Sequence, residues 1–122
     1  MAELCVVFAV MGAGQRVLTS TRNLIAAAQE DVRVELVCFG DGIALALANG
    51  AAAGDVAALM ALHTGSGGAV NVAVSACRNT LAGRGLDAQT DPGLLVPGVR
   101  VVPAGVLRVA LLQRDHWSYL SV

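Results

Sequence analysis

The strongest constraint on the fold of this chain is residues 70–84 (VNVAVSACRNTLAGR), where a strand pattern changes directly into a helix pattern. Every second residue from Val70 to Val74 is a valine and alternates with smaller residues, which is typical of a strand. From Ser75 onward the spacing is that of a helix, and Cys77 lies at the change. Such a junction places the first helical turn at the carboxyl edge of a sheet, where ligands and catalytic groups collect in open α/β proteins.

Cys77 is therefore the candidate nucleophile. The unpaired backbone N–H groups and the helix dipole at such a position favour a thiolate, whereas an ordinary thiol with a pKa near 8.5 is mostly protonated at pH 7. Arg78 adds to this effect only if its side chain turns back toward the sulfur, because consecutive helical positions do not face each other. Burial of the sulfur would raise its pKa. Two interpretations of Cys77 thus stay open, a reactive thiol and a thiol that only packs.

The composition predicts one domain over residues 1–122 that assembles into a homo-oligomer. The chain is 56% hydrophobic and only 14% charged, with a mean hydropathy of +0.67. Its longest apolar run, residues 4–11, is much shorter than the roughly 18 residues that a membrane helix needs, so we expect no membrane contact. A chain with so few charges is expected to cover part of its surface with other copies of itself. Because its start lacks the basic residues of a signal peptide, we expect a cytoplasmic protein.

Charge and residue spacing argue against nucleic acid, metals and cofactors. The formal net charge is −1, all eight basic residues are arginines scattered along the chain, and only four aromatic residues are present. The three cysteines form no CxxC pair, and His63 and His116 lie far apart, so we predict no metal site. A Gly-x-Gly at residues 12–14 follows the first apolar run, but Val17 replaces the third glycine of a dinucleotide motif. We interpret it as a turn and expect no cofactor.

The remaining pattern alternates strands with helices, which predicts an α/β domain with a mostly parallel sheet. The strands are expected at residues 4–10, 32–39, 70–74, 99–102 and 117–122, and the helices at 15–29, 43–49, 55–63, 75–82 and 106–114. Residues 83–98 form a long loop, of the kind that often acts as a lid or an interface arm. Asn71 is unusual, because an amide within a buried strand needs hydrogen-bond partners.

Two further residues are candidates at the carboxyl edge. Asp41 is well placed as the N-cap of the helix at 43–49, and the competing interpretation is a carboxylate that lines the same cleft as Cys77. Cys38 ends the second strand. If that strand neighbours the third, Cys38 could act as a second, resolving thiol for Cys77, provided that the two residues come close enough. Cys5, within the first strand, is expected to fill the core.

Four segments of the chain resemble the DsrE/DsrF-like family, relatives of bacterial sulfur-relay subunits. They are Arg-Asn-Leu at 22–24, Val-Glu-Leu-Val followed by Phe-Gly-Asp-Gly-Ile at 34–43, Cys-x-Asn-Thr-Leu at 77–81, and a closing Gly-Val, Leu-Gln and Trp-Ser-Tyr-Leu within 105–120. The resemblance implies a three-layer α/β/α sandwich with a five-stranded sheet of order 3-2-1-4-5, assembled as a trimer or hexamer. The chain departs from the family at His116, where a glycine usually precedes the tryptophan.

In sulfur-relay members a cysteine after the third strand carries persulfide sulfur, and Cys77 matches that position. The resemblance therefore implies a persulfide carrier or sulfurtransferase component that exchanges sulfur with a donor or acceptor protein. We expect Asp41, Arg78 and Asn79 to be the binding residues beside the sulfur. The alternative is a non-catalytic module that binds a small anion or a protein partner at the same edge, with Cys77 merely packed.

Overall fold

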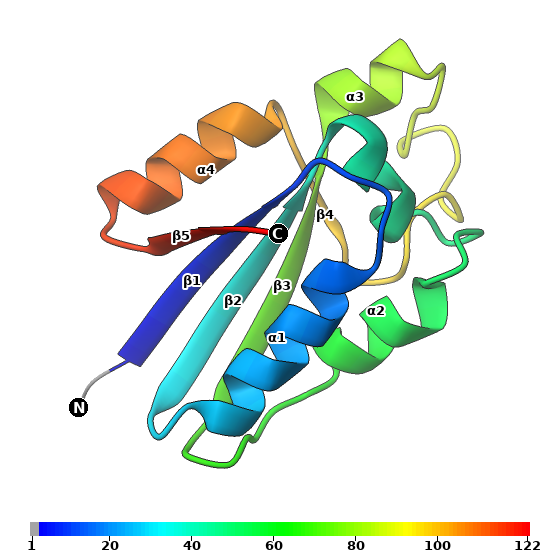
Figure 1. Cartoon of the computed structure of the whole chain (residues 1–122). Helices are drawn as coiled ribbons and strands as arrows, with labels where there is room; N and C mark the ends of the chain where they lie inside the picture. The colour runs from blue at the N-terminus through cyan, green and yellow to red at the C-terminus, as the bar shows by residue number, and fades with distance from the viewer. Residues whose placement is uncertain (1–2) are drawn as a thin grey trace.

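Five parallel strands form a single sheet in the order β4-β3-β2-β1-β5 (Figure 1). The structure is a computed structural model that describes residues 3–122. Its elements, in chain order, are β1 (Glu3–Val10), α1 (Arg16–Ala27), β2 (Asp31–Cys38), the 3-10 helix η1 (Gly40–Ala46), α2 (Ala53–Met60), β3 (Val70–Cys77), α3 (Arg78–Gly83), β4 (Arg100–Val102), α4 (Gly105–Arg114) and β5 (Ser118–Ser121). The α/β class and the parallel five-stranded sheet predicted from the sequence are confirmed.

The predicted order 3-2-1-4-5 agrees with the structure over the three central strands and at the β5 edge, but β4 lies beside β3 rather than beside β1. The loop before β4 explains its place. The Val96 amide donates to the Ala46 carbonyl at 2.9 Å, and Leu95 forms an antiparallel bridge with Leu47. Because these bonds hold the loop against η1, the chain re-enters the sheet next to β3.

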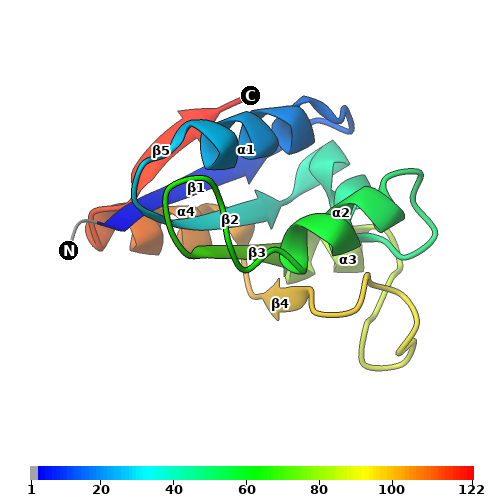
Figure 2. The same cartoon turned by 90° about the horizontal axis from the view of Figure 1, so that it is seen from below.

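Strand alternation divides the side chains between the two faces of the sheet, and helices lie on both faces (Figure 2). The first face packs against α1, η1 and α2 and forms the larger apolar core, which includes Phe8, Leu36 and Val74. The second face packs against α4 through a small cluster around Val37 and Val109. The amphipathic period of each helix and the apolar runs of the central strands thus account for the core.

The second face becomes polar toward β3. Asn71 and Arg33, which are register partners on neighbouring strands, both lie exposed there. Asn71 is therefore exposed to solvent, and it is not the buried amide that the apolar strand pattern indicated, because the strand is open on this side. Cys5 also points to this face and is only half-buried, so it is not the core residue that we expected.

The turn between β2 and η1 depends on two glycines. Gly40 has a φ of +57°, which favours glycine, and a Cβ on Gly42 would lie 1.9 Å from the Val10 carbonyl oxygen. Together they bring the chain close to the end of β1 before η1 begins. Asp41 lies inside the first turn of η1, whose N-cap is Phe39, so the prediction that Asp41 caps a helix at 43–49 is wrong.

The C-terminus of α4 ends in a Schellman motif. The Trp117 amide donates to the Leu112 carbonyl and the His116 amide to the Gln113 carbonyl, both at 3.0 Å. His116 occupies the left-handed position of this motif with a φ of +69°, where glycine is preferred. The departure from the family at His116 thus falls on a residue with a strained backbone.

Some helices are shorter than predicted. Helix α2 ends at Met60, so His63 lies beyond it rather than in its last turn.

Within residues 3–122, no helix has the length and apolar character required to cross a bilayer.

Candidate functional site at the carboxyl edge of the sheet

Cys77 is the last residue of β3 and the N-cap of α3. The predicted change from strand to helix is present, but β3 continues to Cys77 and α3 begins at Arg78, so the prediction of a helix from Ser75 is wrong by three residues. The Cys77 side chain alternates away from Ala76, which packs in the core of the first face, and so points to the face that carries α4. The residue is buried, with 5% of its surface exposed. The sulfur therefore lies between the start of α3 and the start of α4.

Burial raises the pKa of Cys77, but hydrogen-bond donors around the sulfur outweigh it and lower the pKa below the usual value of a thiol. These donors are the Thr80 hydroxyl and the backbone amides of Thr80, Gly105 and Asn79. Cys77 makes no short capping hydrogen bond to the helix. The donors consequently act on the charge that develops when the thiol ionises, and the site favours a thiolate.

Thr80 connects this site to the turn after β2. Its hydroxyl oxygen accepts the Gly40 amide at 3.1 Å, which leaves the hydroxyl proton available to the Cys77 sulfur. Its position three residues after the N-cap is the one from which a side chain reaches back to the start of a helix. That spacing is a signal in the sequence for a role of Thr80, although Thr80 was not among the predicted site residues.

Gly105 was not among the predicted site residues either. It supplies a backbone amide near the Cys77 sulfur from a different element. It is the first residue of α4 and is buried. A Cβ at this position would lie 2.7 Å from Cδ1 of Phe39, so only glycine lets the start of α4 come this close to the end of β2. The amide that faces Cys77 therefore depends on close packing between α4 and Phe39.

The expected binding residues Asp41 and Asn79 flank α3 in different ways. Asp41 forms an ion pair with Arg84 at 2.9 Å, and its side chain is 79% exposed. This ion pair links η1 to the C-terminal end of α3. Asp41 is not among the groups that change the pKa of Cys77. Asn79 faces the sulfur through its backbone amide.

Arg78 lies exposed in the first turn of α3 and lines a cavity of about 600 Å³. The other walls of this cavity come from Leu81, Val101 and the loop at residues 85–89. Arg78 is not among the groups that change the pKa of Cys77. The contribution of Arg78 that we made conditional on its side chain turning back toward the sulfur is therefore not observed.

Cys38 cannot act as a resolving thiol for Cys77. Its register partner is Ala76, and both residues belong to the core of the first face, whereas Cys77 points to the second. Two cysteines whose Cβ atoms point apart cannot be joined without a backbone movement. Burial also raises the pKa of Cys38 to about 12. The predicted adjacency of the strands is confirmed, but the alternation of side chains separates the two sulfurs.

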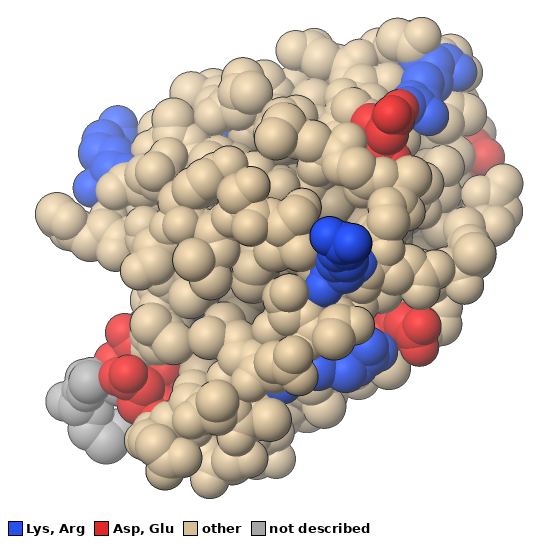
Figure 3. All heavy atoms as spheres, viewed as in Figure 1, with Lys and Arg blue, Asp and Glu red and all other residues tan. Residues whose placement is uncertain are grey.

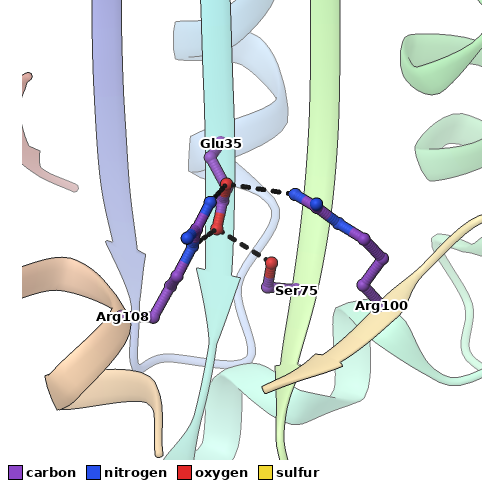
Figure 4. Close-up of polar contacts among 4 residues, drawn as sticks. All are labelled: Glu35, Ser75, Arg100 and Arg108. Carbon is purple, nitrogen blue, oxygen red and sulfur yellow. Dashed lines mark hydrogen bonds and ion pairs between the residues drawn. The ribbon is translucent and has the colours of Figure 1, made fainter. Parts of the chain in front are cut away.

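The structure also contains a buried ionic network that the sequence did not reveal. Glu35 projects from β2 onto the second face, and its side chain is only 2% exposed. Arg108 from α4 donates two hydrogen bonds of 2.7 Å, one to each carboxylate oxygen, as Figure 4 shows. Ser75 donates a third hydrogen bond to the carboxylate at 2.9 Å, and a terminal nitrogen of Arg100, from β4, lies 3.3 Å from its Oε1 atom. Burial alone would raise the pKa of Glu35, but these partners hold it below the usual range.

This network supports the two elements that meet at Cys77. Ser75 precedes Cys77 by two residues on the same face of β3, and Arg108 follows Gly105 by three residues in α4. The signal in the sequence was an acidic residue in the middle of an apolar strand. The sequence pattern did not show which residues would pair with it.

No group of three or more His, Cys, Asp or Glu side chains within residues 3–122 is arranged to hold a metal ion.

Comparisons with known proteins identify the family of the chain and agree with its fold. The family model of the DsrE/DsrF-like family matches residues 5–122. The fold is similar to the solved structure of MTH1491, a protein of unknown function from Methanobacterium thermoautotrophicum, with a TM-score of 0.80 and 29% sequence identity. That match covers 98% of this chain and 99% of the other. No curated protein matches the chain. The family model spans the chain almost from end to end, and the protein belongs to the DsrE/DsrF-like family.

Proposed function

We propose that this protein is a sulfur-relay component that carries sulfur as a persulfide on Cys77. The observation that carries the proposal is the set of donors that lowers the pKa of Cys77, drawn from both α3 and α4. A thiolate is the form of cysteine that attacks sulfur, and the same donors would stabilise a persulfide anion at this position. Membership of the DsrE/DsrF-like family supports the proposal, because the family is associated with sulfur relay.

The proposed transfer conserves atoms and electrons. The Cys77 thiolate attacks the outer sulfur of a persulfide on a donor protein, and a new S–S bond forms at Cys77. The donor's S–S bond breaks, and its cysteine leaves as a thiolate. No external oxidant is needed, because the sulfur moves at constant oxidation state. Transfer to an acceptor thiolate is the same step in reverse.

We also propose that the protein assembles as a trimer or as a dimer of trimers. The low charge of the chain supports assembly, and Figure 3 shows that charged side chains are few on the face that carries α1. Exposed apolar side chains on α4 and near the C-terminus, including Val106, Leu107 and Leu120, offer contact surface. A monomeric mass by light scattering at micromolar concentration would contradict this proposal.

A reducing compartment suits the proposed activity, because the cysteines at positions 5, 38 and 77 are all free thiols. We therefore place the relay in the cytoplasm.

Whole-protein mass spectrometry tests the proposed function. After incubation with a persulfide donor, the wild-type protein should gain the mass of one sulfur atom, and a thiol reductant should remove it. Cys77→Ser should gain none, whereas the matched variant Cys38→Ser should behave as the wild type. A gain that persists in Cys77→Ser, or no gain in the wild type, would favour the alternative of a non-catalytic binding module.

A further inference from the structure

A polar cavity of about 420 Å³ lies on the second face of the sheet, away from the carboxyl edge. It opens between α4 and the start of β4, over the part of β2 and β3 that α4 leaves uncovered. Its polar lining comes from Arg33, Glu35, Asn71, Arg100, Arg108 and Trp117. Neither Cys77 nor the donors around it line this cavity, so it is separate from the proposed sulfur site.

The charge in the cavity is unbalanced. Three arginines line it, and Glu35 is the one carboxylate among the described residues of the lining. Arg108 engages both oxygens of Glu35 at 2.7 Å, which neutralises that carboxylate. Arg33 and Arg100 remain as two positive charges in a concave surface. Such an arrangement attracts anions, because a recess concentrates the field of the charges that line it.

Arg33 is held in place without a carboxylate. Its Cζ atom lies 5.5 Å from the centre of the Trp117 ring, a cation–π distance, and no acidic group within residues 3–122 forms an ion pair with it. No side-chain hydrogen bond within residues 3–122 uses the Arg33 guanidinium, so its N–H donors are free for a ligand.

Arg100 and Asn71 supply further donors. The Arg100 side chain is 60% exposed and uses one terminal nitrogen for a contact of 3.3 Å with Glu35, so most of its donors are unused (Figure 4). Asn71 is exposed on β3 and is the register partner of Arg33. Its position therefore places an amide beside Arg33 in the wall of the cavity.

We propose that this cavity binds a small organic dianion whose carboxylate or phosphate groups are held by Arg33, Arg100 and Asn71. A dianion matches the two positive charges that Glu35 leaves uncompensated, and a planar carboxylate or a phosphate matches the fork of an arginine. The cavity volume is in the range of pockets that take small ligands.

Trp117 provides the test, because it is the only tryptophan of the chain and forms part of the cavity wall. Succinate and inorganic phosphate are titrated separately into the full-length protein at constant ionic strength, with tryptophan fluorescence and calorimetry as independent readouts. We expect saturable binding of at least one of them, and the preferred probe identifies the anionic group. Arg100→Ala should weaken binding about tenfold or more by both readouts. Arg33→Ala should weaken it to a similar extent, measured by calorimetry because Arg33 contacts the Trp117 ring.

Arg16→Ala is the matched control, because this exposed arginine at the start of α1 does not line the cavity. It should bind as the wild type does. Circular dichroism checks that each variant is folded, and Asn71→Ala, at an exposed position, replaces Arg100→Ala if that variant is not. No saturable signal with either anion in the wild type, or an equal loss in Arg16→Ala, would overturn the proposal. Unchanged binding in the folded cavity variants would overturn it as well. None of these outcomes bears on sulfur transfer at Cys77.

Discussion

Arg108 in α4 and Glu35 in β2 form a bidentate ion pair, with both hydrogen bonds at 2.7 Å. The pair lies beneath the only helix that packs on the second face within residues 3–122, one turn from the amide that faces Cys77. It therefore positions α4 and, through it, the environment of the proposed sulfur site.

Replacing Glu35 by glutamine should destabilise the protein by roughly 3 kcal/mol, because it leaves the Arg108 guanidinium without its counter-charge. This loss of unfolding free energy is at the lower end of the range for a broken buried ion pair, since the Arg108 side chain is 30% exposed. Urea unfolding measures the change. The surface pair between Arg22 and Asp55, at 3.6 Å, is the control, and Asp55→Asn should lower the free energy of unfolding by less than about 1 kcal/mol. Equal losses in the two variants would contradict a buried network.

The contribution of Glu35 should also depend on pH. Its pKa in the folded state lies below the usual value, so the folded state stabilises the carboxylate. This stability is fully present above the unfolded pKa of about 4.3 and is lost as the pH falls through the folded pKa. The difference in unfolding free energy between the wild type and Glu35→Gln should thus be constant from pH 7 to about pH 5 and shrink at lower pH. A difference that grows on acidification would show that Glu35 is protonated in the folded protein.

Replacing His116 by glycine should stabilise the protein by about 1 kcal/mol, because His116 has a φ of +69° at the end of α4. Gly85 is the matched control, with a φ of +71° and no atom within 4 Å of an added Cβ. Gly85→Ala should destabilise by a similar amount, since it adds the same backbone strain without a clash. Thermal unfolding of both variants measures the effect. A less stable His116→Gly would show that the side chain makes a contact that outweighs the strain.

Replacing Thr80 by valine should raise the pKa of Cys77, because valine has nearly the same shape but cannot donate a hydrogen bond to the thiolate. Thr80→Ser keeps the hydroxyl and should keep the lowered pKa. The absorbance of the thiolate at 240 nm, followed against pH in a Cys5→Ser background, reports the value. If valine and threonine give the same titration, the donors around Cys77 are wrongly assigned.

The sequence predicted the parts of the fold that follow from local patterns. The change from strand to helix predicted that Cys77 lies near the junction of β3 and α3, although the strand continues three residues further than expected. The apolar runs of β1 and β2 predicted their central place in a parallel sheet. The place of β4 was not predictable, because it depends on bonds between the loop before it and η1, which is distant in sequence.

The candidate site was predicted only in part, again because some of its contacts join elements that are distant in sequence. Cys77 and its position follow from local spacing, whereas the Gly105 amide and the partners of Glu35 come from elements up to 73 residues away. The error at Cys38 came from treating adjacent strand ends as adjacent side chains, although a one-residue offset in register places the two sulfurs on opposite faces.

The central claim, that Cys77 is the thiolate nucleophile, is tested most directly by the rate of iodoacetamide alkylation of each cysteine against pH in the folded protein. Cys77 should react first at neutral pH, and the midpoint of its pH profile should lie below the ordinary thiol value of about 8.5. Cys5, whose pKa is raised by burial and by the nearby Glu3, should have a midpoint above it, and the fully buried Cys38 should react only after denaturation. If Cys77 reacts only after denaturation, or with a midpoint at or above that of Cys5, it is a packed thiol and not a sulfur carrier.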